Sequence, residues 1–196
     1  MVKWSNQNKL NFNKMAKVEI LQTGYSSTES NGRSSPTISL VVDENKKIIV
    51  DPGVVKDQKV IVDALKKHNL AISDVDFVFV THWHPDHARN VGMFEKAVVI
   101  DWWGWWENDL FKDFSGKLTK DIKIIKTPGH SYDGTSMLVK TDRGTVAICG
   151  DVFWQEDYPE KDPYAQDLKA LQKSRQKVLK LADFIIPGHG AMFKSV

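Results

Sequence analysis

Three histidines and one aspartate gather in a single short stretch, Thr81-His82-Trp83-His84-Pro85-Asp86-His87. His82 and His84 are two positions apart, so in an extended segment both rings point the same way and can share one metal ion. Asp86 and His87 follow a proline turn and can hold a second metal ion close to the first. Because four potential ligands lie so close together, we interpret the stretch as a metal-binding motif.

Two further histidines and a second aspartate lie in three other short loops. His130 lies in Thr-Pro-Gly-His-Ser, His189 in Pro-Gly-His-Gly, and Asp151 directly after Gly150. Each loop follows an apolar run typical of a β-strand, as the first motif follows 75–80. A rigid sheet can aim loop side chains at one point, and the carboxylate of Asp151 could there bridge two cations. The sixth histidine, His68, ends an expected helix and is no ligand candidate.

The composition indicates one ordinary globular domain. The chain has 196 residues, a formal net charge of +2 and a single cysteine, so neither a disulfide framework nor a strongly charged partner is expected. No apolar stretch is long enough to cross a bilayer and no signal-peptide pattern is present, so we expect no membrane partner and a cytoplasmic location. Residues 1–15 are polar and Asn-rich and predict a flexible extension, followed by one domain over 16–196.

The spacing of apolar residues along the chain predicts the helices and strands that must position these residues. Helical spacing predicts helices over 57–69 and 165–182, and a short helical turn over 88–94. The remaining apolar runs predict strands over 18–21, 37–42, 47–50, 75–80, 97–100, 122–126, 135–140, 145–149 and 183–186. Strand runs on either side of two helices favour two packed sheets flanked by helices.

The order H-x-H-x-D-H, T-P-G-H, G-D and P-G-H-G resembles the metallo-β-lactamase superfamily, from about Lys17 to the end of the sequence. The resemblance implies an α/β fold, the αββα sandwich, in which two mixed β-sheets pack face to face with helices outside. It also implies two metal ions, zinc first, with iron or manganese as alternatives. Asp51, at the end of an expected strand, would support the metal loop without binding a metal. The implied ligands are His82, His84 and His130 for one ion, Asp86, His87 and His189 for the other, and Asp151 between them.

A dinuclear centre of this kind implies a hydrolase. Two cations about 3.5–4 Å apart lower the pKa of a bridging water toward neutrality, and the resulting hydroxide attacks an electrophilic centre. Asp86 would be the catalytic residue that orients this hydroxide and takes its proton. The same chemistry hydrolyses lactams, thioesters, lactones and phosphodiesters, so the substrate depends on what surrounds the metals.

Several segments are similar to the small metallo-β-lactamase domain-containing proteins, namely 20–25, 90–94, 150–153 and 174–179. That branch includes a eukaryotic member assigned to cleavage of histone pre-mRNA, so the resemblance implies a ribonuclease acting on single-stranded RNA. The alternatives are a small-molecule hydrolase of thioesters, lactones or β-lactams and an iron-dependent persulfide dioxygenase.

Four tryptophans in five positions form an unusual stretch after the expected strand 97–100. Indole rings are large, and each N–H needs a partner when it is buried. The stretch could be a substrate wall, a contact in a homodimer or a cap on the core, and aromatic faces could also stack nucleobases. We include all four as candidate substrate-binding residues: Trp102, Trp103, Trp105 and Trp106.

Overall fold

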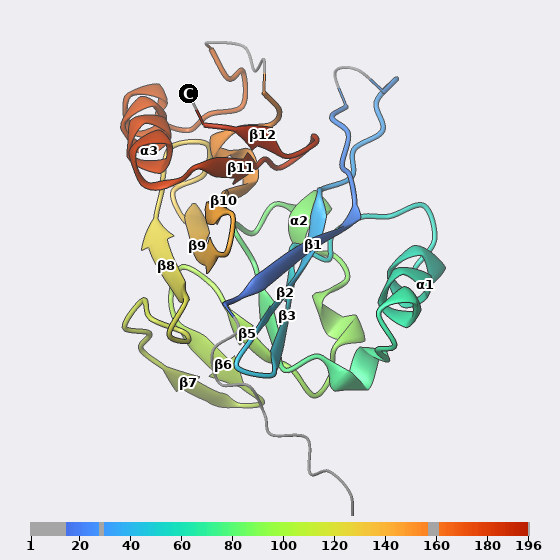
Figure 1. Ribbon diagram of the computed structural model, residues 1–196. Coiled ribbons are helices and arrows are strands. Elements are labelled where there is room, and N and C mark those ends of the chain that lie inside the picture. Colours follow the sequence, from blue (N-terminus) through green and yellow to red (C-terminus); the bar gives the residue numbers. More distant parts are fainter. Residues whose placement is uncertain (1–14, 28–29, 157–160, 196) are drawn as a thin grey trace, which may run out of the picture.

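The computed structural model describes residues 15–27, 30–156 and 161–195 and contains two β-sheets with few helices (Figure 1). Its α-helices are α1 (Lys59–Lys67), the single turn α2 (Pro85–Ala88) and α3 (Leu168–Leu181). Short 3-10 turns are η1 (Ile72–Asp74), η2 (Val91–Met93) and η3 (Gly150–Val152). The extension expected over 1–15 falls almost wholly outside the described residues and stays a prediction.

The first sheet has its seven strands in chain order, from β1 to β7. The first three strands pair antiparallel, β3 to β5 pair parallel, and β6 and β7 return antiparallel. Its strands are β1 (Lys17–Gln22), β2 (Ile38–Asp43), β3 (Lys46–Val50), β4 (Phe77–Phe79), β5 (Val98–Ile100), β6 (Trp105–Glu107) and β7 (Leu110–Lys112).

The second sheet has five strands in the order β12-β11-β10-β9-β8. Strands β10 and β11 are parallel, and β8 shares their direction because both β8 and β10 pair antiparallel with β9. The carboxyl ends of these three strands therefore meet at one edge. The strands are β8 (Ile122–Lys126), β9 (Thr135–Thr141), β10 (Gly144–Ile148), β11 (Phe184–Ile186) and β12 (Phe193–Lys194).

Three apolar clusters separate four layers and confirm the expected αββα sandwich. The central cluster lies between the sheets and joins Phe79 and Val50 of the first to Met137 and Ile148 of the second. A second cluster packs α1 and its neighbours on the outer face of the first sheet. The third packs α3 on the outer face of the second sheet. Figure 1 shows α1 and α3 on opposite sides of the molecule.

Both long helices form where the apolar spacing predicts them, but each is shorter than its predicted range. Helix α1 buries Ile61, Ala64 and Leu65, which lie three and four positions apart on one face. Helix α3 begins after Asp167, whose side chain accepts a hydrogen bond from the N–H of Ala170 and so satisfies a free donor of the first turn. No helix among the described residues is long and apolar enough to cross a membrane.

The tryptophan-rich stretch is partly a strand, which the sequence did not predict. Trp105 and Trp106 begin β6 and pair with Ile100 and Val99 of β5. Because side chains alternate along a strand, Trp105 faces the central core and meets Phe77 edge to face at 5.2 Å. Trp106 lies on the opposite face and is 40% exposed. The strands are only three residues long, too short for alternation to be recognised.

Candidate metal centre

Every candidate ligand lies in a loop or turn that follows the carboxyl end of a strand. His82 and His84 follow β4, and the first turn of α2 carries Asp86 and His87. The loops after β8, β10 and β11 carry His130, Asp151 and His189. Since these three strands share one direction, their loops reach the same edge and meet the loop that follows β4.

The first group of donors is formed by three histidines. The Nδ1 atom of His84 lies 3.0 Å from the Nε2 atom of His82 and 3.0 Å from the Nε2 atom of His130. One carboxylate oxygen of Asp151, Oδ2, completes the group at 3.3 Å from His130 Nε2 and 4.0 Å from His82 Nε2. Three imidazoles with one oxygen donor suit zinc in tetrahedral coordination.

The second group of donors is formed by Asp86, His87 and His189. The two Nε2 atoms of the histidines are 3.4 Å apart, and Asp86 Oδ2 lies 3.6 Å from that of His189. The other carboxylate oxygen of Asp151, Oδ1, is 3.3 Å from each of these Nε2 atoms. Asp151 therefore presents one oxygen to each group, the arrangement of a bridging ligand.

Hydrogen bonds on the outer side of the rings show that these donors fit metal ions. His87 Nδ1 lies 2.8 Å from Asp51 Oδ2, His130 Nδ1 lies 2.6 Å from Asp162 Oδ2, and His189 Nδ1 lies 3.0 Å from the carbonyl oxygen of Ser35. Each contact fixes a proton on the outer nitrogen, so the inner Nε2 lone pair points at the centre. Such outer partners orient the histidines of metal sites and raise their basicity.

Asp51 anchors two of the ligand positions at once. Besides its contact to His87, it accepts hydrogen bonds from the backbone N–H and the hydroxyl of Thr81, at 2.8 and 2.7 Å. Because the Thr81 hydroxyl donates to Asp51, its oxygen is left to accept from His82 Nδ1 at 3.1 Å. Asp51 is buried and has a positive φ of 49°, a conformation that is uncommon for aspartate and is held here by these contacts.

The sequence alone did not identify three partners of the candidate ligands. Asp162 and Thr81 contact the outer nitrogens of His130 and His82. Ser34 donates from its hydroxyl to Asp86 Oδ2 at 2.8 Å across 52 positions of sequence. No local pattern identifies such partners, because the fold alone brings them together.

Burial and neighbouring charges shift the pKa values of four candidate ligands. Burial, followed by the neighbouring His87, lowers the pKa of His82 well below its usual value, and burial together with His130 lowers that of His84. Burial also acts on His87, but the carboxylates of Asp151 and Asp51 outweigh it and raise its pKa. Burial opposes ionisation of Asp151, yet His189 and His87 hold its pKa well below the usual range. The lowered pKa values keep His82 and His84 neutral at neutral pH, the form in which an imidazole binds a metal ion.

A cleft of about 400 Å³ opens over the two groups of donors. Its aromatic wall is Trp154, with Tyr164 stacked on it at 5.6 Å between ring centroids. No lysine or arginine is among the described residues that line it. The lining residues are Ser26, Ser27, Ser34, His84, Asp86, His130, Asp151, Trp154, Tyr164 and His189.

The four tryptophans proposed as substrate contacts lie outside this lining. Trp103 and Trp106 line a separate pocket beside Trp83. Trp102 lies under the ammonium group of Lys126, 4.0 Å from its ring centroid, and Trp105 packs on the core. Their role in substrate binding stays a prediction.

Comparison with known proteins gives one consistent family. Residues 31–112 match the family model described as the metallo-beta-lactamase superfamily. The Xenopus laevis metallo-beta-lactamase domain-containing protein 1 is 31% identical over 159 residues, which cover 76% of this chain and 68% of the frog protein. A Methanocaldococcus jannaschii protein named a probable metallo-hydrolase is 32% identical over 159 residues. The match covers 75% of this chain and 73% of the archaeal protein. The chain spans only 59% of the human protein that shares the frog protein's name.

Solved structures share the fold at lower identity. A Thermotoga maritima protein of the metallo-β-lactamase type superposes with a TM-score of 0.72 at 21% identity. The match covers 92% of this chain and 99% of the Thermotoga chain. The Bacillus thuringiensis protein AiiA, solved with N-decanoyl-L-homoserine at its active site, gives a TM-score of 0.64 at 17% identity. The match covers 90% of this chain and 93% of AiiA.

Proposed function

The chain belongs to the metallo-β-lactamase superfamily of hydrolases, and we propose that it hydrolyses an uncharged acyl substrate, such as a lactone or thioester, at a dinuclear metal centre. The observation that carries the proposal is the cleft over the ligands, whose described lining combines serines with the Trp154–Tyr164 wall and holds no lysine or arginine. A cleft whose described lining has no cationic side chain suits a substrate without phosphates, because polyanions are normally bound through lysine and arginine.

The metal ions, when bound, supply an attacking water acidified toward neutral pH and stabilise the oxyanion that develops. The protein supplies the remaining steps. Asp86 reaches the cleft with its Oδ2 atom, where it can accept the proton of the attacking water, and the Ser34 hydroxyl holds that oxygen in place. The aromatic wall can pack the acyl chain and exclude water from one side of the reacting carbon.

The structural relative solved with N-decanoyl-L-homoserine supports this substrate class by analogy of fold. That analogy and the absence of lysine and arginine from the described lining lead us to place acyl compounds before RNA, which reverses the order suggested by the sequence.

Single-stranded RNA remains the second candidate because of one observation. Tyr164 is 59% exposed and stacks on Trp154 with an interplanar angle of 18°, so its free face can take a nucleobase. Stacking of this kind contributes about 1–3 kcal/mol per base, and bound metals would themselves attract a phosphate.

One panel separates the two candidates. Zinc-loaded protein is assayed with an acyl homoserine lactone, a chromogenic thioester and labelled single-stranded RNA, beside the variant Asp86→Asn. We expect turnover of the lactone or thioester that falls by about 10²–10⁴-fold in the variant. RNA cleavage that depends on Asp86, with no turnover of either acyl substrate, would reject the acyl hydrolase and favour the ribonuclease.

A further inference from the structure

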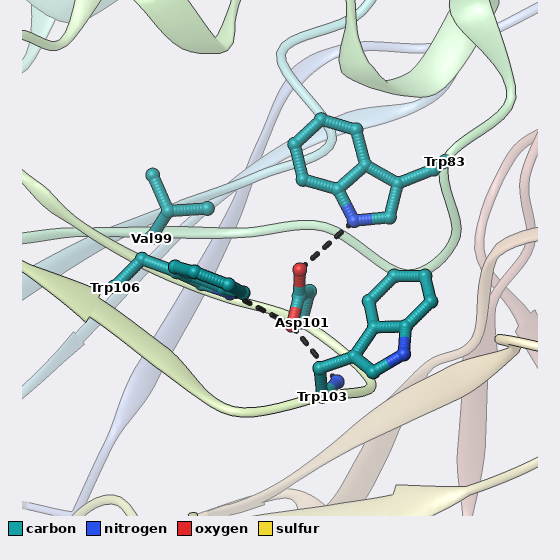
Figure 2. A pocket seen from close by; sticks show the side chains of 5 residues that line it. All are labelled: Trp83, Val99, Asp101, Trp103 and Trp106. Atoms are coloured by element: carbon teal, nitrogen blue, oxygen red, sulfur yellow. Dashed lines mark hydrogen bonds between the residues drawn. The ribbon is translucent and has the colours of Figure 1, made fainter. Parts of the chain in front are cut away.

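A second pocket, of about 450 Å³, lies on the outer face of the first sheet beside the metal loop. Its lining is Trp83, Val99, Asp101, Trp103 and Trp106. Trp83 lies between the ligands His82 and His84, Val99 and Trp106 pair across β5 and β6, and Asp101 follows β5. Figure 2 shows the three indoles arranged around the carboxylate of Asp101. Nothing in the metal centre uses this pocket.

Asp101 accepts hydrogen bonds from the indole N–H groups of Trp83 and Trp106 and from the backbone of Trp103. Its Oδ2 atom accepts from Trp83 Nε1 at 2.9 Å, and its Oδ1 atom accepts from Trp106 Nε1 at 3.3 Å. Oδ1 also accepts from the backbone N–H groups of Trp103 and Gly104, at 2.9 and 3.0 Å. The side chain of Asp101 is 4% exposed, whereas the three tryptophans are 40–44% exposed. Aromatic faces therefore cover a buried carboxylate.

The Asp101 carboxylate accepts these hydrogen bonds only from uncharged N–H groups. Among the described residues, no lysine or arginine forms an ion pair with Asp101. A second buried carboxylate, that of Asp133, accepts the backbone N–H of Trp83 at 3.0 Å and also lacks such an ion pair. Burying an anion without an opposite charge is costly, so this pocket is electrostatically prepared for a cation.

The indoles add a second attraction for the same kind of ligand. An indole face carries the negative part of the ring quadrupole and attracts a cation. In Trp83 and Trp106, donation of the indole N–H to the Asp101 carboxylate pushes electron density into the ring and strengthens that attraction. The neighbouring Trp102 already takes the ammonium group of Lys126 at 4.0 Å from its ring centroid, although it lies outside the pocket.

We propose that the pocket of Trp83, Trp103 and Trp106 over Asp101 binds a small organic cation with a quaternary ammonium group. The lining surface is almost entirely apolar, since the Asp101 oxygens are buried and already accept four hydrogen bonds. A primary ammonium or a guanidinium would lose its water without gaining acceptors. A quaternary ammonium has no N–H to satisfy and loses little on entering, so it fits a cage of aromatic rings.

The test compares choline with its uncharged carbon isostere, 3,3-dimethyl-1-butanol. Each is titrated into the ¹⁵N-labelled, zinc-loaded full chain while the indole N–H signals of the seven tryptophans are followed by NMR, after assignment with single Trp→Phe variants. We expect saturable shifts confined to the indoles of Trp83, Trp103 and Trp106, with the choline Kd at least about tenfold below that of the alcohol, as one or more cation–π contacts would give.

Two variants locate the site and one serves as a control. Trp103→Ala, at an exposed side chain, should abolish the choline shifts. Asp101→Asn keeps a carbonyl oxygen for the turn and should raise the choline Kd several-fold while leaving the alcohol unaffected. Tyr164→Ala removes an exposed aromatic ring in the metal cleft and should bind choline as the wild type does.

Three results would overturn the proposal. Equal affinity for choline and the alcohol would make the pocket merely apolar, and shifts confined to other indoles would place the ligand elsewhere. Sedimentation as a dimer that hides the three indoles and binds no choline would make a second copy of the chain the occupant.

Discussion

At the scale of single residues, the candidate metal centre depends on side chains that are not themselves candidate ligands. Asp51 and Asp162 each accept a hydrogen bond from the outer nitrogen of a candidate ligand histidine. The Ser34 hydroxyl donates a hydrogen bond to the carboxylate of Asp86. A histidine without its outer partner can turn or carry its proton on the wrong nitrogen. The affinity for metal should therefore respond to residues outside the ligand set.

Asp162→Asn tests this expectation directly. Asparagine can turn its amide nitrogen toward His130 and remove the fixed charge, so the tautomer with an inward lone pair is less favoured. We expect the metal affinity to fall by about 10–100-fold, measured by competition with a coloured zinc chelator. Asp142→Asn, at an exposed turn position, is the matched control and should bind as the wild type does. Equal affinity in both variants would leave Asp162 without a role in the site.

Cys149 gives a second prediction at this scale. The thiol is 1% exposed and burial raises its pKa far above the usual value, so the reactive thiolate is scarce and shielded. We expect no labelling by a disulfide reagent at pH 8 in the folded protein and complete labelling in urea. Fast labelling of the folded protein would show that the end of β10 opens to solvent.

At the scale of elements, close approach of backbone segments brings the two donor groups together. The loop after β11 passes against Asp151, and a Cβ atom placed on Gly188 would overlap the Oδ1 atom of that side chain. Gly53 lies equally close to the backbone of Asp86. Glycine is needed at both positions because there is no room for a side chain.

Gly188→Ala should therefore lower both stability and metal binding. We expect its Tm to fall by at least about 5 °C, since the overlap must be relieved by moving Asp151 or the loop and each kcal/mol shifts the Tm by roughly 2–4 °C in a chain of this size. Gly92→Ala meets no atom within 4 Å and should change the Tm by less than about 2 °C. Similar values for the two variants, from thermal unfolding followed by circular dichroism, would contradict this packing.

The sequence predicted those elements whose pattern is local. The strands that precede His82, His130 and His189 were recognisable from apolar runs, and the candidate ligands were chosen from their spacing after these strands. The alternation of Trp105 and Trp106 across β6 was not recognisable, because a three-residue strand offers too little pattern. Asp162 and Ser34 could not be assigned to ligands either, since their partners lie far away in the chain.

At the scale of the whole molecule, four loops from two sheets meet at the metal centre, so bound metal should hold the sheets together. A ligand that binds only the folded state stabilises it by RT ln(1 + [L]/Kd), about 2.7 kcal/mol at one hundred times Kd. We expect removal of metal with EDTA to lower the Tm by roughly 5–10 °C, with recovery when zinc is added back. An unchanged Tm would mean that the donors hold no metal in solution.

The most direct test of the dinuclear centre is the metal content of the purified chain, measured by mass spectrometry beside Asp151→Ala and His189→Ala. The placement of Asp151, with one oxygen facing each donor group, predicts two metal ions per chain in the wild type. His189→Ala should keep one of them, and Asp151→Ala should weaken both. A single iron per chain, or one metal that is unaffected by His189→Ala, would contradict the dinuclear account.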